Sequence, residues 1–584
     1  MSSEKALKNN KTSPSSNKKS RNKKTSSPKS SSPTPSTLRI GKRYRATRVD
    51  KSYDAIVIGS GIGGMTTAAM LSKAGKKVLV LEQHYTAGGY THSYSRNGYE
   101  WDVGVHYIGE VGNPKSQMRK IFDFITDGQL KWAKMDNNYD RFHFGDDVYN
   151  LTAGKEEFIT DLSERFPEEQ AAIKKYVSLL DKVNNLVPLQ MMDKLLPSLL
   201  EKPYNFFKKY GLPSYLNNTT YEVLSTLTQD QKLIAVLTGQ YGDCGLPPKE
   251  SSFFIHALIA RHYLYGAYYP EGGAWKIADT IIPVIQQSGG DLLTYAEVSE
   301  IVIKKNQAVG VKMADGHIIS SKKIISGAGV INTFSHLLPK AVADKHGYTE
   351  KLKSVQSSKA HLGMYIGLKG SPEELKLPKT NFWIFSDYDA QKCIDTFESD
   401  MRAEFPVVYI SFPAAKDPIW QSRHPDKSTI EIVTPCPYEW FEKWKDEPWG
   451  KRGAEYDKLK EYFTERMLEA LYEKMPHLRG KIDYFETSTP LSTDFFCAYK
   501  KGELYGLNHD PQRFEQSWLK PKTSIKGLYL SGQDVLTCGV GGAMMGGLMA
   551  TVSVLGWQSY KLLSKFGFTN TAQIALPESL DSAV

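Results

Sequence analysis

Three glycines near residue 60 are the first group whose spacing indicates a chemistry. Gly59, Gly61 and Gly64 follow the pattern G-x-G-x-x-G. In such a loop the first glycine allows a tight turn, the second lets the backbone approach a pyrophosphate, and the third lets the following helix pack on a sheet. The phosphate then lies at the helix N-terminus, where the peptide dipoles favour negative charge. The spacing therefore predicts a dinucleotide site.

A carboxylate and a second glycine pair follow this loop. Glu82 lies 23 residues after Gly59, where a carboxylate can accept hydrogen bonds from both hydroxyls of a ribose. Gly88 and Gly89 begin six residues after the acid, and such a bare loop permits close approach to the phosphate and ribityl part of an extended dinucleotide. A site for NAD alone does not require this pair, so the residues favour FAD.

The segments around these residues must position them. Residues 53–58 and 78–81 are short apolar runs rich in β-branched side chains, and residues 62–74 have a helical pattern. Further strands are expected at residues 296–304, 308–313, 317–326 and 527–531. Strands near both ends and in the middle predict an α/β fold, with a Rossmann-type FAD-binding domain assembled from discontinuous segments and a mixed α+β substrate domain.

The expected domains interleave along the chain. The FAD-binding domain takes residues 51–112, 252–335 and 480–562, the substrate domain takes residues 113–251 and 336–479, and residues 563–584 form a C-terminal tail. Residues 111–251 are expected to be mostly helical. Within them, residues 186–212 mix Leu, Met and Phe with Lys, which suits either an interfacial membrane helix or a lid of the substrate domain.

Residues 1–50 are expected to be a disordered basic arm. Residues 1–48 contain fourteen Lys and Arg residues and one acid, Glu4, so they carry a formal charge of +13 and leave −3 for the rest of a chain whose total is +10. The nearly neutral body gives no indication of nucleic-acid binding. No apolar run followed by a small-residue cleavage site is visible, so no secretory signal peptide is expected; a transit peptide, a nuclear address or a membrane-touching arm fits the composition.

Two further patterns concern metals and membranes. The five cysteines are far apart and lack a C-x-x-C pair, so no metal site is expected. Residues 535–556 contain no charge and are long enough to span a bilayer. They are rich in glycine and directly follow an expected strand, which favours a buried helix whose N-terminus faces the flavin.

Several segments together resemble one family. They are residues 59–94, residues 98–112 (GYEWDVGVHYIGEVG), residues 268–281 (YYPEGGAWKIADTI), residues 489–506 (TPLSTDFFCAYKKGELYG) and residues 527–547 (GLYLSGQDVLTCGVGGAMMGG). The chain resembles the phytoene desaturase and carotenoid isomerase superfamily of flavoproteins over about residues 52–560. The stretch from His106 to Gly109 looks most like its retinol saturase (all-trans-retinol 13,14-reductase) branch.

The resemblance implies specific cofactor contacts. Gly59, Gly61, Gly64, Glu82, Gly88 and Gly89 would contact FAD, Val298 would lie near the adenine, and Gly532, Gln533 and Asp534 would follow the ribityl chain. Gly532 is followed by Gln533 where the family more often has aspartate, which places the role of Asp534 in question. His106 and Tyr107 follow the strand leading beneath the flavin, so either could orient substrate or donate a proton.

The resemblance also implies an activity and a location. We expect an FAD-dependent oxidoreductase that saturates a C=C bond of a retinoid-like or carotenoid-like polyene, with NAD or NADP considered as electron donor. Carotenoid desaturation and cis-trans isomerisation remain open, as does a non-enzymatic prenyl-lipid carrier. The expected partners are an apolar isoprenoid and a peripheral membrane surface, which the resemblance places at the endoplasmic reticulum, without nucleic acid or metal.

Overall fold

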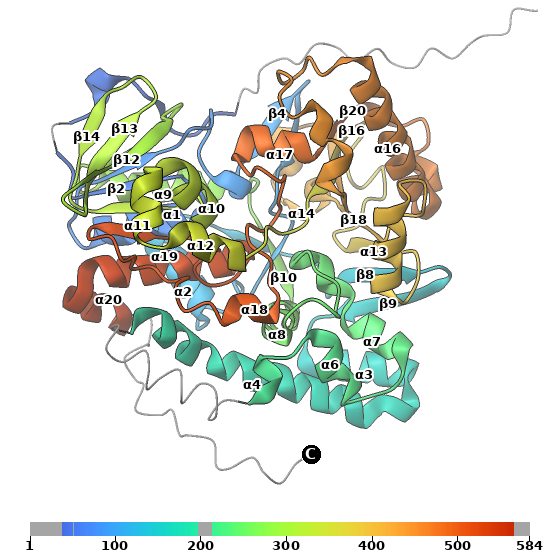
Figure 1. The fold of residues 1–584 in the computed structure, drawn as a ribbon. Coiled ribbons are helices and arrows are strands. Elements are labelled where there is room, and N and C mark those ends of the chain that lie inside the picture. Colours follow the sequence, from blue (N-terminus) through green and yellow to red (C-terminus); the bar gives the residue numbers. More distant parts are fainter. Residues whose placement is uncertain (1–37, 51, 197–212, 566–584) are drawn as a thin grey trace, which may run out of the picture. The chain divides into compact units, whose positions relative to one another are not determined.

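Six parallel strands form the sheet that carries the glycine loop (Figure 1). The computed structural model describes residues 38–50, 52–196 and 213–565. The order along the sheet is β1 (Lys42–Arg43), β11 (Asp291–Thr294), β3 (Val78–Leu81), β2 (Ala55–Ile58), β15 (Ile324–Ser326) and β21 (Leu528–Leu530). β2 and β3 are buried along their whole length, as expected for a parallel sheet covered on both faces. The predicted α/β fold with a discontinuous Rossmann-type domain is confirmed.

Helices of this first unit pack on the parallel sheet. α1 (Ile62–Lys73) joins β2 to β3 and is buried from Ile62 to Ser72. It packs against α9 (Lys276–Gln286) and α19 (Gly539–Leu555). α19 is formed by the uncharged stretch near residue 545. Together with the helical residues after it, α19 forms the segment Gly539–Lys565, which is long and apolar enough to cross a membrane. Half of an apolar 18-residue stretch within this segment is buried inside the protein.

A second, mostly antiparallel sheet carries the other half of the protein. Its order is β20 (Ile482–Ser488), β16 (His361–Lys369), β19 (Lys427–Pro435), β18 (Val407–Ser411), β17 (Asn381–Phe385), β8 (Asn138–Phe144) and β9 (Asp147–Thr152). α16 (Gly453–Lys474) shares one hydrophobic cluster with this sheet. α3 (Lys155–Arg165), α4 (Gln170–Leu195) and α8 (Phe253–Tyr263) share another. The expected mixed α+β unit is therefore present.

Smaller elements connect the two sheets. β4 (Ser93–Arg96) pairs with β5 (Tyr99–Asp102), and β10 (Ala267–Pro270) lies between β6 (Ile108–Gly109) and β7 (Trp132–Lys134). β12 (Val298–Lys304), β13 (Gln307–Met313) and β14 (Ile318–Ser320) form an antiparallel sheet. The remaining principal helices are α2 (Gln117–Ile125), α6 (Thr220–Ser225), α7 (Gln231–Leu237), α13 (Ala390–Ser399), α14 (Pro413–Lys416), α17 (Pro490–Cys497), α18 (Pro511–Phe514) and α20 (Tyr560–Lys565).

Some expected elements and boundaries differ from the structure. Residues 317–326 form two strands in different sheets, β14 and β15, rather than one. The expected helical segment 111–251 contains the β8–β9 hairpin. β20, expected in the cofactor domain, instead pairs with β16 in the antiparallel sheet, and α8, also expected there, packs its apolar residues in the cluster beside that sheet.

The ends of the expected arm and lid also need correction. Residues 42–43, expected in the disordered arm, form β1 and pair with β11 at the edge of the parallel sheet. Residues 186–195 form the last turns of α4. The rest of the lid segment, residues 197–212, and residues 1–37 lie outside the described residues.

Candidate active site

One cavity of about 1120 Å³ brings together residues from both sheets. Ligand pockets commonly measure about 300–1,000 Å³, so this space exceeds the volume of an ordinary single-ligand site. Its lining includes the two glycine loops at one part and aromatic side chains of the antiparallel unit at another. A large cofactor and a second molecule can therefore share it.

The two glycine loops lie against each other at the cavity wall. Gly61 and Gly88 form an isolated parallel bridge, and a Cβ on Gly89 would lie 2.9 Å from the Gly61 Cα. Gly59 and Gly89 have φ of +90° and +55°, which favours glycine at both positions. A Cβ on Gly61 would meet no protein atom within 4 Å. The Gly61 backbone therefore faces open space, as an approaching pyrophosphate requires.

Glu82 is held in place by its neighbours. Its Oε2 accepts hydrogen bonds from the Ser60 amide and hydroxyl at 2.8 and 2.7 Å, and its Oε1 accepts one from the His84 amide at 2.8 Å. Each carboxylate oxygen can accept more than one hydrogen bond, and Glu82 lines the cavity. The arrangement leaves acceptors for ribose hydroxyls. Val298 also lines the cavity, as expected for the adenine end.

Two helices begin at this cavity and touch through glycines. Cavity-lining residues include Gly61 and Ile62 at the start of α1, and Gly539 and Val540 at the start of α19. A Cβ on Gly547 of α19 would lie 2.4 Å from the Gly63 carbonyl oxygen of α1. Because helix N-termini carry partial positive charge, both ends favour the anionic or electron-rich parts of a bound dinucleotide.

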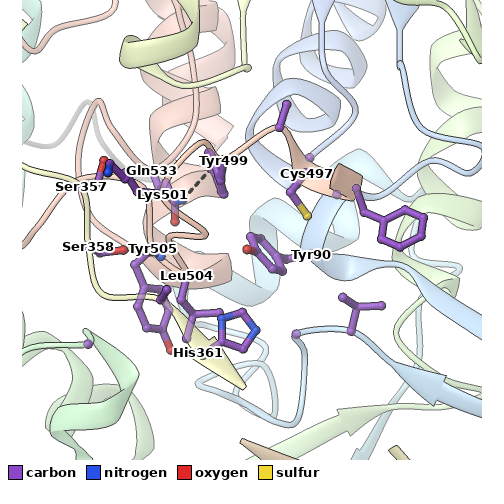
Figure 2. A pocket seen from close by; sticks show the side chains of 18 of the residues that line it. Tyr90, Ser357, Ser358, His361, Cys497, Tyr499, Lys501, Leu504, Tyr505 and Gln533 are labelled. Carbon is purple, nitrogen blue, oxygen red and sulfur yellow. Dashed lines mark hydrogen bonds between the residues drawn. The ribbon is translucent and has the colours of Figure 1, made fainter. Parts of the chain in front are cut away.

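The turn after β21 divides between the cavity and the protein interior. Gly532 and Gln533 line the cavity, and the Gln533 amide donates to the Tyr499 hydroxyl at 3.0 Å (Figure 2). Asp534 points away, because its carboxylate accepts the Val330 and Leu507 amides at 2.8 and 3.2 Å. Its place behind the cavity lining differs from the expected contact with the ribityl chain.

His106 and Tyr107 have different surroundings. His106 lines the cavity, and its Nδ1 lies 2.8 Å from Glu431 Oε2. Tyr107 is outside the lining; it is buried and donates its hydroxyl to Asp140 at 2.9 Å. Burial raises the pKa of the Tyr107 phenol well above its ordinary value. The geometry therefore brings His106, and not Tyr107, to a ligand.

Burial controls the charge of His106 and its partner. It lowers the pKa of His106 to about 3, with the neighbouring Lys416 charge lowering it further, and raises the pKa of Glu431 to about 8. Burial therefore favours the neutral form of both groups. The Glu431 O–H then donates to Nδ1, which leaves the proton of the imidazole on Nε2.

The other part of the cavity has an aromatic and aliphatic wall that sequence analysis did not identify. Lining side chains there include Tyr241, Trp383, Ile394, Phe397, Val407, Tyr409 and Trp440. They come from α13, from strands of the antiparallel sheet and from two short 3-10 helices, Gly239–Asp243 and Tyr438–Trp440, so no local pattern shows that they meet. Figure 2 shows Tyr90, His361 and Tyr505 among the lining side chains of the pocket. This wall suits an apolar ligand.

Five buried polar atoms in the lining have no hydrogen-bond partner among the described residues. They are His84 Nε2, the Tyr241 hydroxyl, His361 Nδ1, Trp383 Nε1 and the Tyr409 hydroxyl. Buried polar groups normally have hydrogen-bond partners, so a ligand or water is the natural partner for each. Within the described part of the chain, no group of three or more His, Cys, Asp or Glu side chains is placed to hold a metal ion.

The chain has extensive similarity to known oxidoreductases. Residues 57–125 match the NAD(P)-binding Rossmann-like domain. An all-trans-retinol 13,14-reductase from Danio rerio is 38% identical over 527 residues, with 86% of each chain covered. A Danio rerio protein described as an inactive all-trans-retinol 13,14-reductase is 31% identical, covering 88% of this chain and 87% of the relative.

More distant relatives and solved structures agree with the fold. A chloroplastic prolycopene isomerase from Daucus carota is 26% identical, covering 85% of this chain and 79% of the relative. A wild-type putrescine oxidase bound to putrescine has a TM-score of 0.56 at 12% identity, covering 86% of this chain and 98% of the solved one. At this identity the structural likeness supports the fold alone. By its close relatives, the chain belongs to the all-trans-retinol 13,14-reductase family of flavin-dependent oxidoreductases acting on CH–CH groups.

Proposed function

We propose that the protein binds FAD in the described cavity and saturates one C=C bond of a retinoid. The observation that carries this proposal is the composition of the cavity. Glycine loops, a held carboxylate and two helix N-termini line one part, and an aromatic wall with a neutral histidine lines another. The close relatives are all-trans-retinol 13,14-reductases, which supports all-trans-retinol as the first substrate to test.

The lining residues fit FAD in three respects. Gly61 presents bare backbone to open space, Glu82 has free acceptor capacity, and Gly532 also has no protein atom within 4 Å of a built Cβ. When bound and reduced, FAD would supply a hydride to one carbon of the double bond. We propose NAD or NADP as the external electron donor that reduces the flavin.

The protein would contribute positioning, water exclusion and a proton. The aromatic wall would hold the polyene and keep water away from it. His106 would donate the Nε2 proton to the second carbon of the bond, since its other ring nitrogen is occupied by Glu431. Saturation requires this proton, whereas cis-trans isomerisation involves no net addition of hydrogen.

Anaerobic single-turnover measurements test the function. Pre-reduced protein mixed with all-trans-retinol is expected to show flavin reoxidation together with loss of polyene absorbance. Unchanged flavin with an altered retinoid isomer would support the isomerase alternative, and reoxidised flavin with a longer polyene absorbance would contradict saturation. A purified protein without a flavin spectrum would favour the lipid-carrier alternative. Parallel mixing of oxidised protein with NADH or NADPH tests the donor by flavin bleaching.

A membrane surface is proposed as the source of the apolar substrate. Trp557 and Tyr560, just beyond α19, are 97% and 66% exposed, with Lys561 and Lys565 close by. The end of α4 adds Met192, which is 43% exposed, and Figure 1 shows this end of α4 near α20. Exposed aromatic and basic residues on neighbouring helices suit a peripheral membrane contact.

The double variant W557S/Y560S is expected to bind vesicles roughly tenfold more weakly, which corresponds to about 1.4 kcal/mol of lost burial in the membrane interface. Flotation with vesicles of phosphatidylcholine and phosphatidylserine measures the effect. Ile318→Ser is a matched control, because Ile318 is 56% exposed on β14 in another region. Equal flotation of all three proteins would reject this surface.

A further inference from the structure

A buried group of ionisable residues lies behind His106. Asp102 ends β5, Glu431 lies on β19 and Lys416 ends α14. Each is at most 2% exposed. Ionisable residues are seldom fully buried unless they are paired or functional, and their clustering beside a cavity indicates a role in the reaction.

The contacts of Glu431 form a path that ends in the cavity. One carboxyl oxygen, Oε2, lies 2.8 Å from His106 Nδ1, and the other accepts the Asp102 amide at 2.7 Å. The second ring nitrogen of His106 makes no hydrogen bond within the described part of the chain. Because His106 lines the cavity, this nitrogen is available to a ligand. A proton can therefore pass from Glu431 through the imidazole without leaving hydrogen-bond distance.

Lys416 is placed to stabilise the charge that such a transfer leaves behind. Its ammonium donates to the His106 carbonyl at 3.0 Å, to the Ser411 hydroxyl at 2.7 Å and to the Asn381 side-chain oxygen. All three acceptors are neutral, and within the described residues no carboxylate lies at salt-bridge distance from it. Its charge lowers the pKa of Glu431, opposing the larger effect of burial. The lysine therefore favours the ionised form of Glu431.

We propose that Glu431 supplies the proton that His106 delivers to the substrate. As hydride from a reduced flavin forms a C–H bond at one carbon, the π electron pair of the double bond takes the Nε2 proton at the other. The N–H electron pair remains on the ring, Nδ1 takes the Glu431 proton, and the O–H electron pair remains on the carboxylate. Solvent then protonates Nε2, and the Nδ1 proton returns to the Glu431 carboxylate, which restores the starting state. This inference rests on the proposed saturation of a C=C bond, and Glu431 acts through His106 rather than on the substrate itself.

The test compares two glutamate-to-glutamine substitutions at positions that lie in one row across the antiparallel sheet. Glu431 and Glu486 both pair with Tyr365, from opposite sides. Glu486 contacts Arg96 and is outside the cavity lining. In E431Q the amide can still hydrogen-bond the imidazole but cannot yield a proton. We expect the single-turnover rate to fall at least about 100-fold, the scale of general-acid catalysis, with KM and the flavin spectrum retained. E486Q should remain within about threefold of the parent protein.

The pH profile separates proton supply from a structural role. The parent rate should fall as pH rises through about 8, because Glu431 then loses its proton. Among the described residues, the groups around Glu431 include His106, Lys416, Asp102, Tyr269 and Tyr365, and the Tyr409 ring lies 5.0 Å from the His106 ring. Burial raises the pKa of Asp102 to about 7 and lowers that of Lys416 to about 7, so both titrate nearby, while burial raises the pKa of the three tyrosines and keeps them neutral.

E431Q should lose the fall near pH 8, and E431D, which retains an acid, should recover part of the rate together with that fall. In the parent protein, a plot of the rate against the deuterium fraction of the solvent should be curved, because two protons move. In E431Q the plot should be linear, because the second proton is absent. An E431Q rate within threefold of the parent, or a slow E431Q with the pH fall intact, would overturn the inference. Failure of the parent protein to consume the retinoid would instead contradict the proposed function.

Discussion

Gly63→Val is expected to yield a protein that does not retain flavin and is strongly destabilised. A Cβ at this position would lie 2.5 Å from the Gly532 Cα and 2.8 Å from the Ala543 carbonyl oxygen. Both are backbone atoms, so no flexible side chain can move aside. Overpacking of a core usually costs about 1–3 kcal/mol, and a valine wedged between two helices should reach or exceed the upper end. The yield of soluble protein, its 450 nm absorbance and its thermal unfolding measure the effect.

Gly61→Ala provides the matched control, because its Cβ would meet no protein atom within 4 Å. Gly61 has φ of −59°, which alanine adopts without strain. We therefore expect a folded protein whose thermal unfolding without cofactor is nearly unchanged, but whose FAD affinity is lower because the methyl group enters the cavity. Full flavin retention by Gly61→Ala would place the pyrophosphate elsewhere. Stable, flavin-bound Gly63→Val would show that α1 and α19 can separate.

The first βαβ unit could be predicted because all of its signals are local. The apolar runs of β2 and β3, the three glycines and the helix between them follow one another within thirty residues, and each has its own periodic pattern. The β8–β9 hairpin also had a local signal, a Gly145-Asp146 turn between short aromatic runs. β1 had none, because it consists of two exposed charged residues that join the sheet by backbone pairing with β11 and by an ion pair between Lys42 and Asp291.

The ionisable residues behind His106 could not be predicted from the sequence. Asp102, Lys416 and Glu431 are separated by up to 329 residues. Each is a charged residue in a segment whose other residues look like those of an ordinary strand or turn. Only the pairing of β19 with its neighbours and the packing of β5 against it bring them together. For the same reason Tyr107, adjacent to His106 in sequence, faces a different part of the core.

His106→Asn is expected to slow the single-turnover reduction of the polyene by about 10²- to 10⁴-fold, the range for loss of a positioned general acid. Asparagine cannot deliver a proton, so the rate should fall. Because asparagine is smaller than histidine and also polar, flavin binding and retinoid binding should persist. Rapid mixing of pre-reduced protein with all-trans-retinol measures the rate, and the visible spectrum confirms bound flavin. His317→Asn, at an exposed position in the β13–β14 turn, is the control. A rate within about threefold of the parent would remove His106 from the chemistry.

The double variant H106N/E431Q distinguishes one proton path from two independent contributions. If Glu431 acts through His106, its substitution has no further effect once the imidazole is gone, so the double variant should be about as slow as H106N alone. If the two residues act separately, the two losses should multiply. The 2.8 Å contact between Nδ1 and the carboxyl group favours the first outcome, because it leaves the Glu431 proton directed at the ring. A multiplied loss would mean that the proton reaches the substrate from Glu431 by another route, and would separate the role of His106 from that of the cluster behind it.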